Sequence, residues 1–158
     1  MKMTPIGAMA SIVGDIFKGI LVGGMRFAIE SLNSEHPAVR SAAISVLSER
    51  PDCIDALKTL LDDPSRLVRI DAAFALRGRL SPNSRAEGEL WGYLNFNADT
   101  PIGALKRAEV FASKGDFEAA KRSAAAAIAL EPNNPQISRE AAVIYIKCKD
   151  APAAVKIL

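Results

Sequence analysis

Few residues of this chain could do chemistry of their own. Its 158 residues include one histidine, His36, and two cysteines, Cys53 and Cys148. A nucleophilic triad needs a base oriented beside the nucleophile, and the sequence around His36 (Glu35-His36-Pro37) offers no identifiable partner. The sequence has no Cys-x-x-Cys pair, phosphate-binding glycine loop, zinc spacing or EF-hand loop. We therefore predict a protein that is not an enzyme and has no catalytic residue, cofactor or metal ion.

The charges are balanced, which argues against a polyanionic partner. Lys and Arg number 20 and Asp and Glu number 18, so the net charge is +2. Long-range attraction to nucleic acid or anionic lipid should be weak at this charge. Five basic residues could still form a DNA-binding face: Lys58, Arg66, Arg69, Arg77 and Arg79. Because Asp62, Asp63 and Asp71 are interleaved with them, nucleic-acid binding is only a distant alternative.

Residues 100–158 contain a sequence repeat with a period of 34. The elements of this repeat must position any binding residue. The matching pairs are Thr100-Pro101 with Asn134-Pro135, Ala108 with Ala142, Phe111 with Tyr145, Asp116 with Asp150, and Ala120 with Ala154. A period in this range indicates stacked helix hairpins. Thr100, Asp116 and Asn134 are suited to cap helices, and Gly115 is suited to close one.

Residues 101–134 resemble the tetratricopeptide repeat. They carry the family's residue types at Ala108, Phe111, Gly115, Ala120, Ala127 and Pro132, and they depart from it at Ala104, Arg107 and Ala124. A second copy keeps Ala142, Tyr145 and Ala154 and stops at Leu158, partway through its second helix. The resemblance implies an all-α fold, a right-handed α-solenoid of antiparallel helix hairpins with about nine helices.

The resemblance also implies a concave groove lined by the first helix of each hairpin. The family's contact places fall in one repeat on Ile102, Leu105, Glu109, Ala112 and Ser113, and in the next on Gln136, Arg139, Val143, Ile146 and Lys147. Leu105 and Glu109 replace the basic residue and asparagine that clamp a terminal carboxylate in chaperone-binding members, so that ligand is not expected. The set implies a partly hydrophobic, partly acidic peptide. The alternative is that these positions pack against a neighbouring repeat or subunit.

A second repeat, with an offset of 29, occupies residues 25–80. Residues 38–47 align with residues 67–76, and residues 52–61 between them are predicted to form a short helix. This segment resembles the HEAT repeat, in which Asp63 and Arg69 stand at the ladder-forming places. The first copy keeps Arg40 but has Ser34 at the acidic place, so the residue types leave its ladder contact open.

Two further segments complete the organisation. Residues 1–24 are apolar and glycine-rich, but Asp15, Lys18 and Arg26 leave no run near the 20 residues of a membrane span. We predict a soluble helix pair or, alternatively, a surface-seeking amphipathic segment. The predicted stripes are Ile12, Ile16 and Ile20 before a break at Gly23-Gly24, and Met25, Ala28, Ile29 and Leu32 after it.

Residues 81–99 are predicted to form a connecting helix that opens at Ser81-Pro82 and forms half of a preceding tetratricopeptide unit. Its aromatic residues, Trp91, Tyr93 and Phe96, should seal the joint between the two repeat types, or else form an exposed partner site.

The order of the two repeats is similar to the C-terminal region of bacterial multihaem c-type cytochrome proteins, over about residues 25–158. Since no Cys-x-x-Cys-His motif occurs, this resemblance implies a haem-free docking module, located in the periplasm. The favoured prediction is a cytoplasmic, non-enzymatic scaffold that binds a peptide or protein partner. The short last helix, with Val155 and Leu158, predicts either self-association or a longer parent chain.

Overall fold

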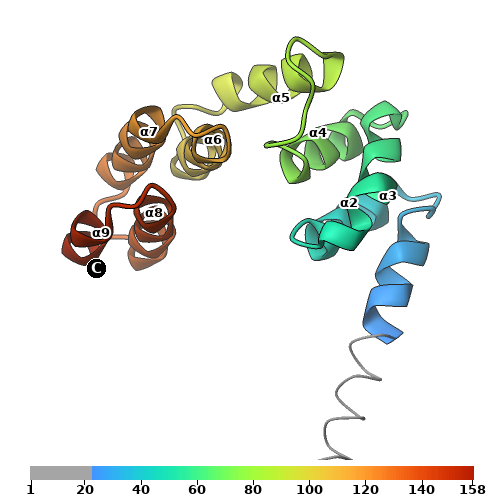
Figure 1. The fold of residues 1–158 in the computed structure, drawn as a ribbon, viewed down its shortest axis with the longest axis horizontal. Coiled ribbons are helices and arrows are strands. Elements are labelled where there is room, and N and C mark those ends of the chain that lie inside the picture. The colour runs from blue at the N-terminus through green and yellow to red at the C-terminus, as the bar shows by residue number, and fades with distance from the viewer. Residues whose placement is uncertain (1–22) are drawn as a thin grey trace, which may run out of the picture. The chain divides into compact units, whose positions relative to one another are not determined.

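The computed structural model describes residues 23–158, and every regular element in that range is a helix (Figure 1). These residues form 9 α-helices, two short 3-10 helices and no strand, which confirms the all-α prediction. The predicted stripe of Ile12, Ile16 and Ile20 lies outside the described residues. The chain divides into two compact units between Ala75 and Leu76, near the predicted limit at residue 80.

The first unit alternates longer and shorter helices. They are residues 23–31, α2 (Pro37–Leu47), η1 (Pro51–Cys53), α3 (Ile54–Thr59), η2 (Leu60–Asp62) and α4 (Arg66–Ala75). Helices α2 and α4 pack against each other, with Ile44, Leu47 and Val68 buried between the elements. The predicted break at Gly23-Gly24 is wrong, because both glycines lie inside the first described helix.

The short helix predicted for residues 52–61 is broken into three parts, η1, α3 and η2. Pro51 opens the first part with a 3-10 turn, where its missing amide costs no helical bond. Leu57 and Leu60 are buried, whereas Ile54 and Leu61 are only half-buried. The inward face is therefore as predicted, and only the helical geometry differs.

A buried ion pair joins the two copies of the 29-residue repeat. The Arg40 guanidinium donates from Nε and Nη2 to both carboxylate oxygens of Asp63, at 2.8 Å each, and both residues are buried. This two-pronged geometry is the strongest form of a charge-assisted hydrogen bond. The sequence left the ladder contact of Arg40 open, and in the structure its partner is Asp63, the acidic residue of the following copy, rather than Ser34.

The hydrogen bonds around this pair recur at the same offset of 29. Arg40 donates through Nη1 to the carbonyls of Ser34 and Glu35, and Arg69 donates through Nη1 to those of Asp63 and Pro64. The side chains of Ser34 and Asp63 likewise accept from the amide two residues later, at 3.3 and 2.8 Å. Ser34 therefore retains the local turn function of the acidic place without its charge.

We expect Asp63→Asn to destabilise the first unit by about 3 kcal/mol at pH 7, because Arg40 would keep a buried charge without its counter-ion. The hydrogen bond from Arg40 holds the pKa of Asp63 below its usual value of 3.8. Its contribution is therefore complete above about pH 4 and is lost as the pH falls through the lowered value. Urea unfolding followed by circular dichroism between pH 7 and pH 2.5 measures both effects.

The matched control is Asp55→Asn, since the Asp55–Lys58 pair is exposed and should contribute little. Equal stability losses in the two variants at pH 7, or an unchanged pH dependence in Asp63→Asn, would contradict the assigned importance of the buried pair.

The second unit contains five helices, α5 (Arg85–Phe96), α6 (Pro101–Ser113), α7 (Phe117–Leu130), α8 (Pro135–Lys147) and α9 (Ala151–Ile157). Helices α6, α7 and α8 begin directly after Thr100, Asp116 and Asn134, the residues predicted to cap them. Helix α5 begins later than its predicted start at Ser81-Pro82. Ser84 caps it by accepting from the Glu87 amide at 3.2 Å, and the Glu87 carboxylate in turn accepts from the Asn83 amide at 2.7 Å. This reciprocal cap sets the first turn.

The period of 34 is visible in the ends of the helices. Thr100 and Asn134 cap α6 and α8, and Asp116 and Asp150 cap α7 and α9, in each case through a side-chain oxygen that accepts from the first helical turn. The residues before the two aspartates, Gly115 and Lys149, have the positive φ values 80° and 62°. Each hairpin therefore has a residue in the left-handed conformation at the equivalent position of its turn.

The two hairpins, α6 with α7 and α8 with α9, lie one on the other (Figure 1). Their shared core consists mostly of alanines and aliphatic residues: Ala104, Leu105, Ala108, Ala120, Ala124, Ala127, Ile137, Ala141, Ile144 and Cys148. Small side chains allow helices to approach closely, and Phe111, Phe117 and Tyr145 pack around the edge of this core. The unit is thus a thin stack rather than a thick globule.

We expect Lys149→Gly to stabilise the second unit by about 0.5–1 kcal/mol, because glycine adopts positive φ without the steric cost that lysine has. The reverse test is Gly115→Ala, which should destabilise by a similar amount. A Cβ at residue 115 would meet no atom within 4 Å, so only the backbone conformation is altered. Urea unfolding followed by the fluorescence of the single tryptophan, Trp91, reports on this unit. A destabilised Lys149→Gly variant would contradict the explanation.

Candidate binding face on α6 and α8

The first helices of the two hairpins, α6 and α8, pack side by side and present one common face. On α8 the residues Arg139, Val143, Ile146 and Lys147 are exposed at spacings of four, three and one, so they lie along a single stripe of the helix. Ile102 is exposed on α6. We call these five residues the α6–α8 face. It combines three apolar side chains with two cations.

Three of the contact residues predicted on α6, namely Leu105, Glu109 and Ala112, are less exposed than those on α8. Leu105 is 3% exposed and belongs to the core, so its side chain packs inside the stack rather than facing a partner. Glu109 forms an ion pair with Arg77 at 3.2 Å, and Ala112 is half-buried. The prediction that Leu105 contacts a partner is therefore not supported by its burial, and most of the accessible surface lies on α8.

Sequence reasoning missed a cluster of cations and aromatic rings between α5 and α6. The rings of Trp91 and Phe111 lie 5.1 Å apart at 49°, and the Lys114 ammonium lies 5.4 Å from the Trp91 ring centre. Lys114 also pairs with Glu87, and this contact holds the pKa of the Glu87 carboxyl below its usual range. The cluster fastens α5 to α6.

Trp91 therefore packs within the second unit, whereas Phe96 is almost fully exposed. The sequence signal for the cluster was Arg107, which stands where the repeat usually has leucine. Its guanidinium lies 5.5 Å from the Phe111 ring centre, and its buried Nε has no hydrogen-bond partner.

We expect Arg107→Leu to stabilise the second unit by about 1 kcal/mol, because it removes a buried, unpaired N–H and adds apolar contact with Phe111. Thermal unfolding followed by Trp91 fluorescence measures the change. Arg122→Leu, at an exposed place on α7, is the control and should leave the midpoint nearly unchanged. A lower midpoint for Arg107→Leu would mean that the contact between its cation and the ring outweighs the buried N–H.

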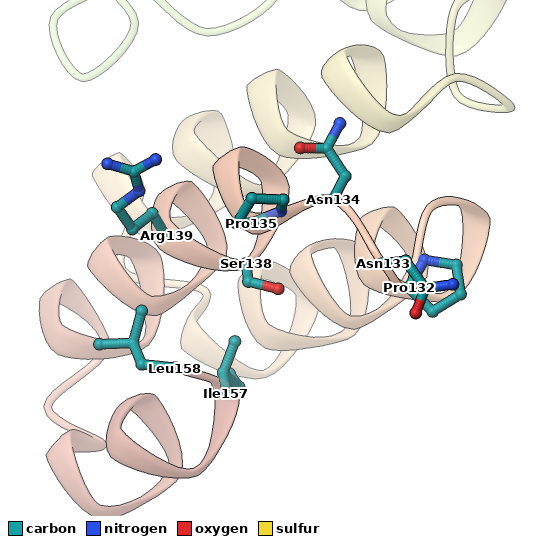
Figure 2. Close-up of a pocket in the computed structure, with 8 residues that line it drawn as sticks. All are labelled: Pro132, Asn133, Asn134, Pro135, Ser138, Arg139, Ile157 and Leu158. Atoms are coloured by element: carbon teal, nitrogen blue, oxygen red, sulfur yellow. The ribbon is translucent and has the colours of Figure 1, made fainter.

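A cavity of about 390 Å³ lies beside the α6–α8 face, between the start of α8 and the end of α9 (Figure 2). Its lining residues are Pro132, Asn133, Asn134, Pro135, Ser138, Arg139, Ile157 and Leu158. Arg139 belongs both to this cavity and to the α6–α8 face. The cavity therefore extends the face towards the loop before α8 and includes polar as well as apolar side chains.

The described residues provide little reactive chemistry. Among residues 23–158 no group of three or more His, Cys, Asp or Glu side chains could hold a metal ion. Cys53 and Cys148 are free thiols and buried, and burial raises the pKa of the Cys148 thiol, which makes it less reactive. In the same part of the chain, no helix is long and apolar enough to cross a bilayer.

Residues 111–158 match the family model of the tetratricopeptide repeat, from the last residues of α6 to the end of α9. This segment is less than half of the chain. It covers the later part, from the end of α6 onwards, of the region in which helices, caps and positive φ values recur with the period of 34. Neither the curated proteins nor the solved structures contain a significant match to the chain. The matched repeat indicates a protein–protein interaction module.

Proposed function

We propose that this chain is a non-enzymatic scaffold that binds a peptide or protein partner on the α6–α8 face. The observation that carries the proposal is the exposure of Val143 and Ile146 on α8 between the cations Arg139 and Lys147. The match of residues 111–158 to an interaction repeat supports it. Exposed apolar side chains grouped in this way are typical of surfaces that a partner covers.

The chemistry of the face indicates the chemistry of the partner. Two adjacent apolar side chains on α8 and Ile102 on α6 favour a partner that presents apolar side chains at a similar spacing. Arg139 and Lys147 have no carboxylate partner among the contacts found in residues 23–158, so they favour acidic residues flanking those side chains. Glu109 adds little negative charge because Arg77 pairs with it.

The proposal also includes residues 25–80, which we interpret as a HEAT-like stack of helices. The hydrogen bonds of Arg40 and Arg69 to the carbonyls before their helices, repeated at an offset of 29, support that interpretation. In this view the first unit is a second stack of the same general kind, built on an arginine–aspartate ladder rather than on alanine packing.

A peptide library displayed against the folded chain tests the proposed binding face. We expect selected peptides to combine apolar with acidic residues. The double variant Val143→Asp/Ile146→Asp should bind them at least tenfold more weakly, a loss of about 1.4 kcal/mol. The double variant Arg139→Glu/Lys147→Glu should also weaken binding. Its loss of affinity should grow as the salt concentration is lowered, because fewer ions then screen the repulsion between the new carboxylates and the acidic residues of the peptide.

The control is Val155→Asp, which introduces the same charge at an exposed apolar place on α9, outside the face. Circular dichroism verifies that all variants stay folded, which is expected since the altered side chains are exposed. Equal binding by the control and the double variant, or selected peptides rich in basic residues, would place the binding surface elsewhere.

A further inference from the structure

The segment that follows α4, residues 76–80, lies against the second half of α6, and we call it the linker. The Arg77 guanidinium pairs with the Glu109 carboxylate at 3.2 Å, and the Arg77 side chain is only 14% exposed. A Cβ placed on Gly78 would lie 3.4 Å from the Ser113 carbonyl oxygen and 3.6 Å from the Ser113 Cβ, so the main chain of the linker passes close to α6. Both contacts lie within the second unit.

The residues that the linker contacts are places where the tetratricopeptide resemblance implies a partner. Glu109 and Ser113 stand about one turn apart on α6 and lie on the same side of that helix. Adding the period of 34 gives Val143 and Lys147, which are exposed on α8 and belong to the α6–α8 face. The stripe that is open on α8 therefore has an occupant on α6, and that occupant is a segment of the same chain.

The ion pair gives this occupant an advantage over a partner. Because the Arg77 side chain is mostly buried and the Glu109 side chain is 33% exposed, salt screens the pair less than it screens a fully exposed one. A basic side chain of a partner would have to displace Arg77, which is tethered beside Glu109 and so has a high effective concentration there. Arg139 and Lys147, in contrast, are exposed, so acidic side chains can reach them directly.

We propose that Arg77 acts as an internal ligand of α6 and determines the charge preference of the partner. By holding Glu109, it keeps basic side chains off α6 and directs the charged side chains of the partner to Arg139 and Lys147 on α8. This inference rests on the proposed function, because it assigns a specificity-determining residue to the same binding site.

Parallel selections of a displayed peptide library on the unaltered chain and on Arg77→Gln test the proposal. The unaltered chain should select peptides that combine apolar and acidic residues. Arg77→Gln should in addition select peptides with a basic residue, because Glu109 is then open to a partner. We expect these peptides to bind Arg77→Gln about tenfold more tightly than they bind the unaltered chain, which corresponds to one charge-assisted hydrogen bond.

Three variants control for effects other than the release of Glu109. Arg77→Gln/Glu109→Ala should lose the added affinity for basic peptides, because the carboxylate is gone. Arg77→Lys keeps a cation beside Glu109 and should select the same peptides as the unaltered chain. Arg79→Gln removes a cation from an exposed place in the same linker and should also select the same peptides. Circular dichroism verifies that each variant is folded.

An NMR measurement tests the contact between the linker and α6 without any peptide. The Arg79 amide donates to the Leu76 carbonyl at 2.7 Å. Glu109→Ala alters a partly exposed side chain and should leave the helices folded. It should make the Arg79 amide exchange with solvent about tenfold faster, because the linker loses its charged contact with α6. Glu140→Ala, at an exposed place on α8, is the matched control and should leave this rate unchanged.

The possible outcomes separate this inference from the proposed function. Unchanged selection by Arg77→Gln, a gain in affinity that survives Glu109→Ala or also appears in Arg79→Gln, or an unchanged exchange rate in Glu109→Ala would overturn the role of Arg77. If the unaltered chain still binds peptides that Val143→Asp/Ile146→Asp rejects, the proposed function stands without it. If the unaltered chain binds no such peptide, the proposed function itself fails, and the role of Arg77 in specificity fails with it.

Discussion

A helix hairpin has two apolar sides and can cover only one of them with its own second helix. This constraint governs both units of the chain. In the second unit, α6 and α7 cover each other, and their remaining apolar side is closed by α8 and α9. In the first unit, α2 closes the apolar side of α4 in the same way. Stability therefore resides in the contacts between successive hairpins as much as within each one.

The two units meet this constraint with different side chains. The second unit relies on alanines without exposed surface, such as Ala108 and Ala124, which bring helices close enough for dense packing. The first unit relies on a buried ion pair between Arg40 and Asp63, which joins consecutive repeats. A buried pair of this kind specifies the register of two helices, since a shifted register would leave each charge without its partner.

The same constraint determines where a partner can bind. A stack of hairpins leaves its first helices in a row, and side chains on the uncovered face of that row have no role in packing. Val143 and Ile146 are such side chains. Leu105, in contrast, is buried in the core, although the period of 34 makes it the counterpart of the exposed Arg139 on α8. The two copies of a repeat are therefore not equivalent as binding surfaces, even though their caps and left-handed turn residues recur.

The sequence by itself determined the all-α class, the period of 34, and the starts of α6, α7 and α8, because caps, prolines and the turn residue at Gly115 act locally. It did not determine which contact places are reachable, since the burial of Leu105 and the pairing of Glu109 with Arg77 depend on neighbouring helices. Nor did it reveal that Arg40 reaches forward to Asp63, or that Phe96 is left exposed. Those outcomes were decided by tertiary packing, because a side chain's partner across a stack depends on the distance between helices, which no local pattern encodes.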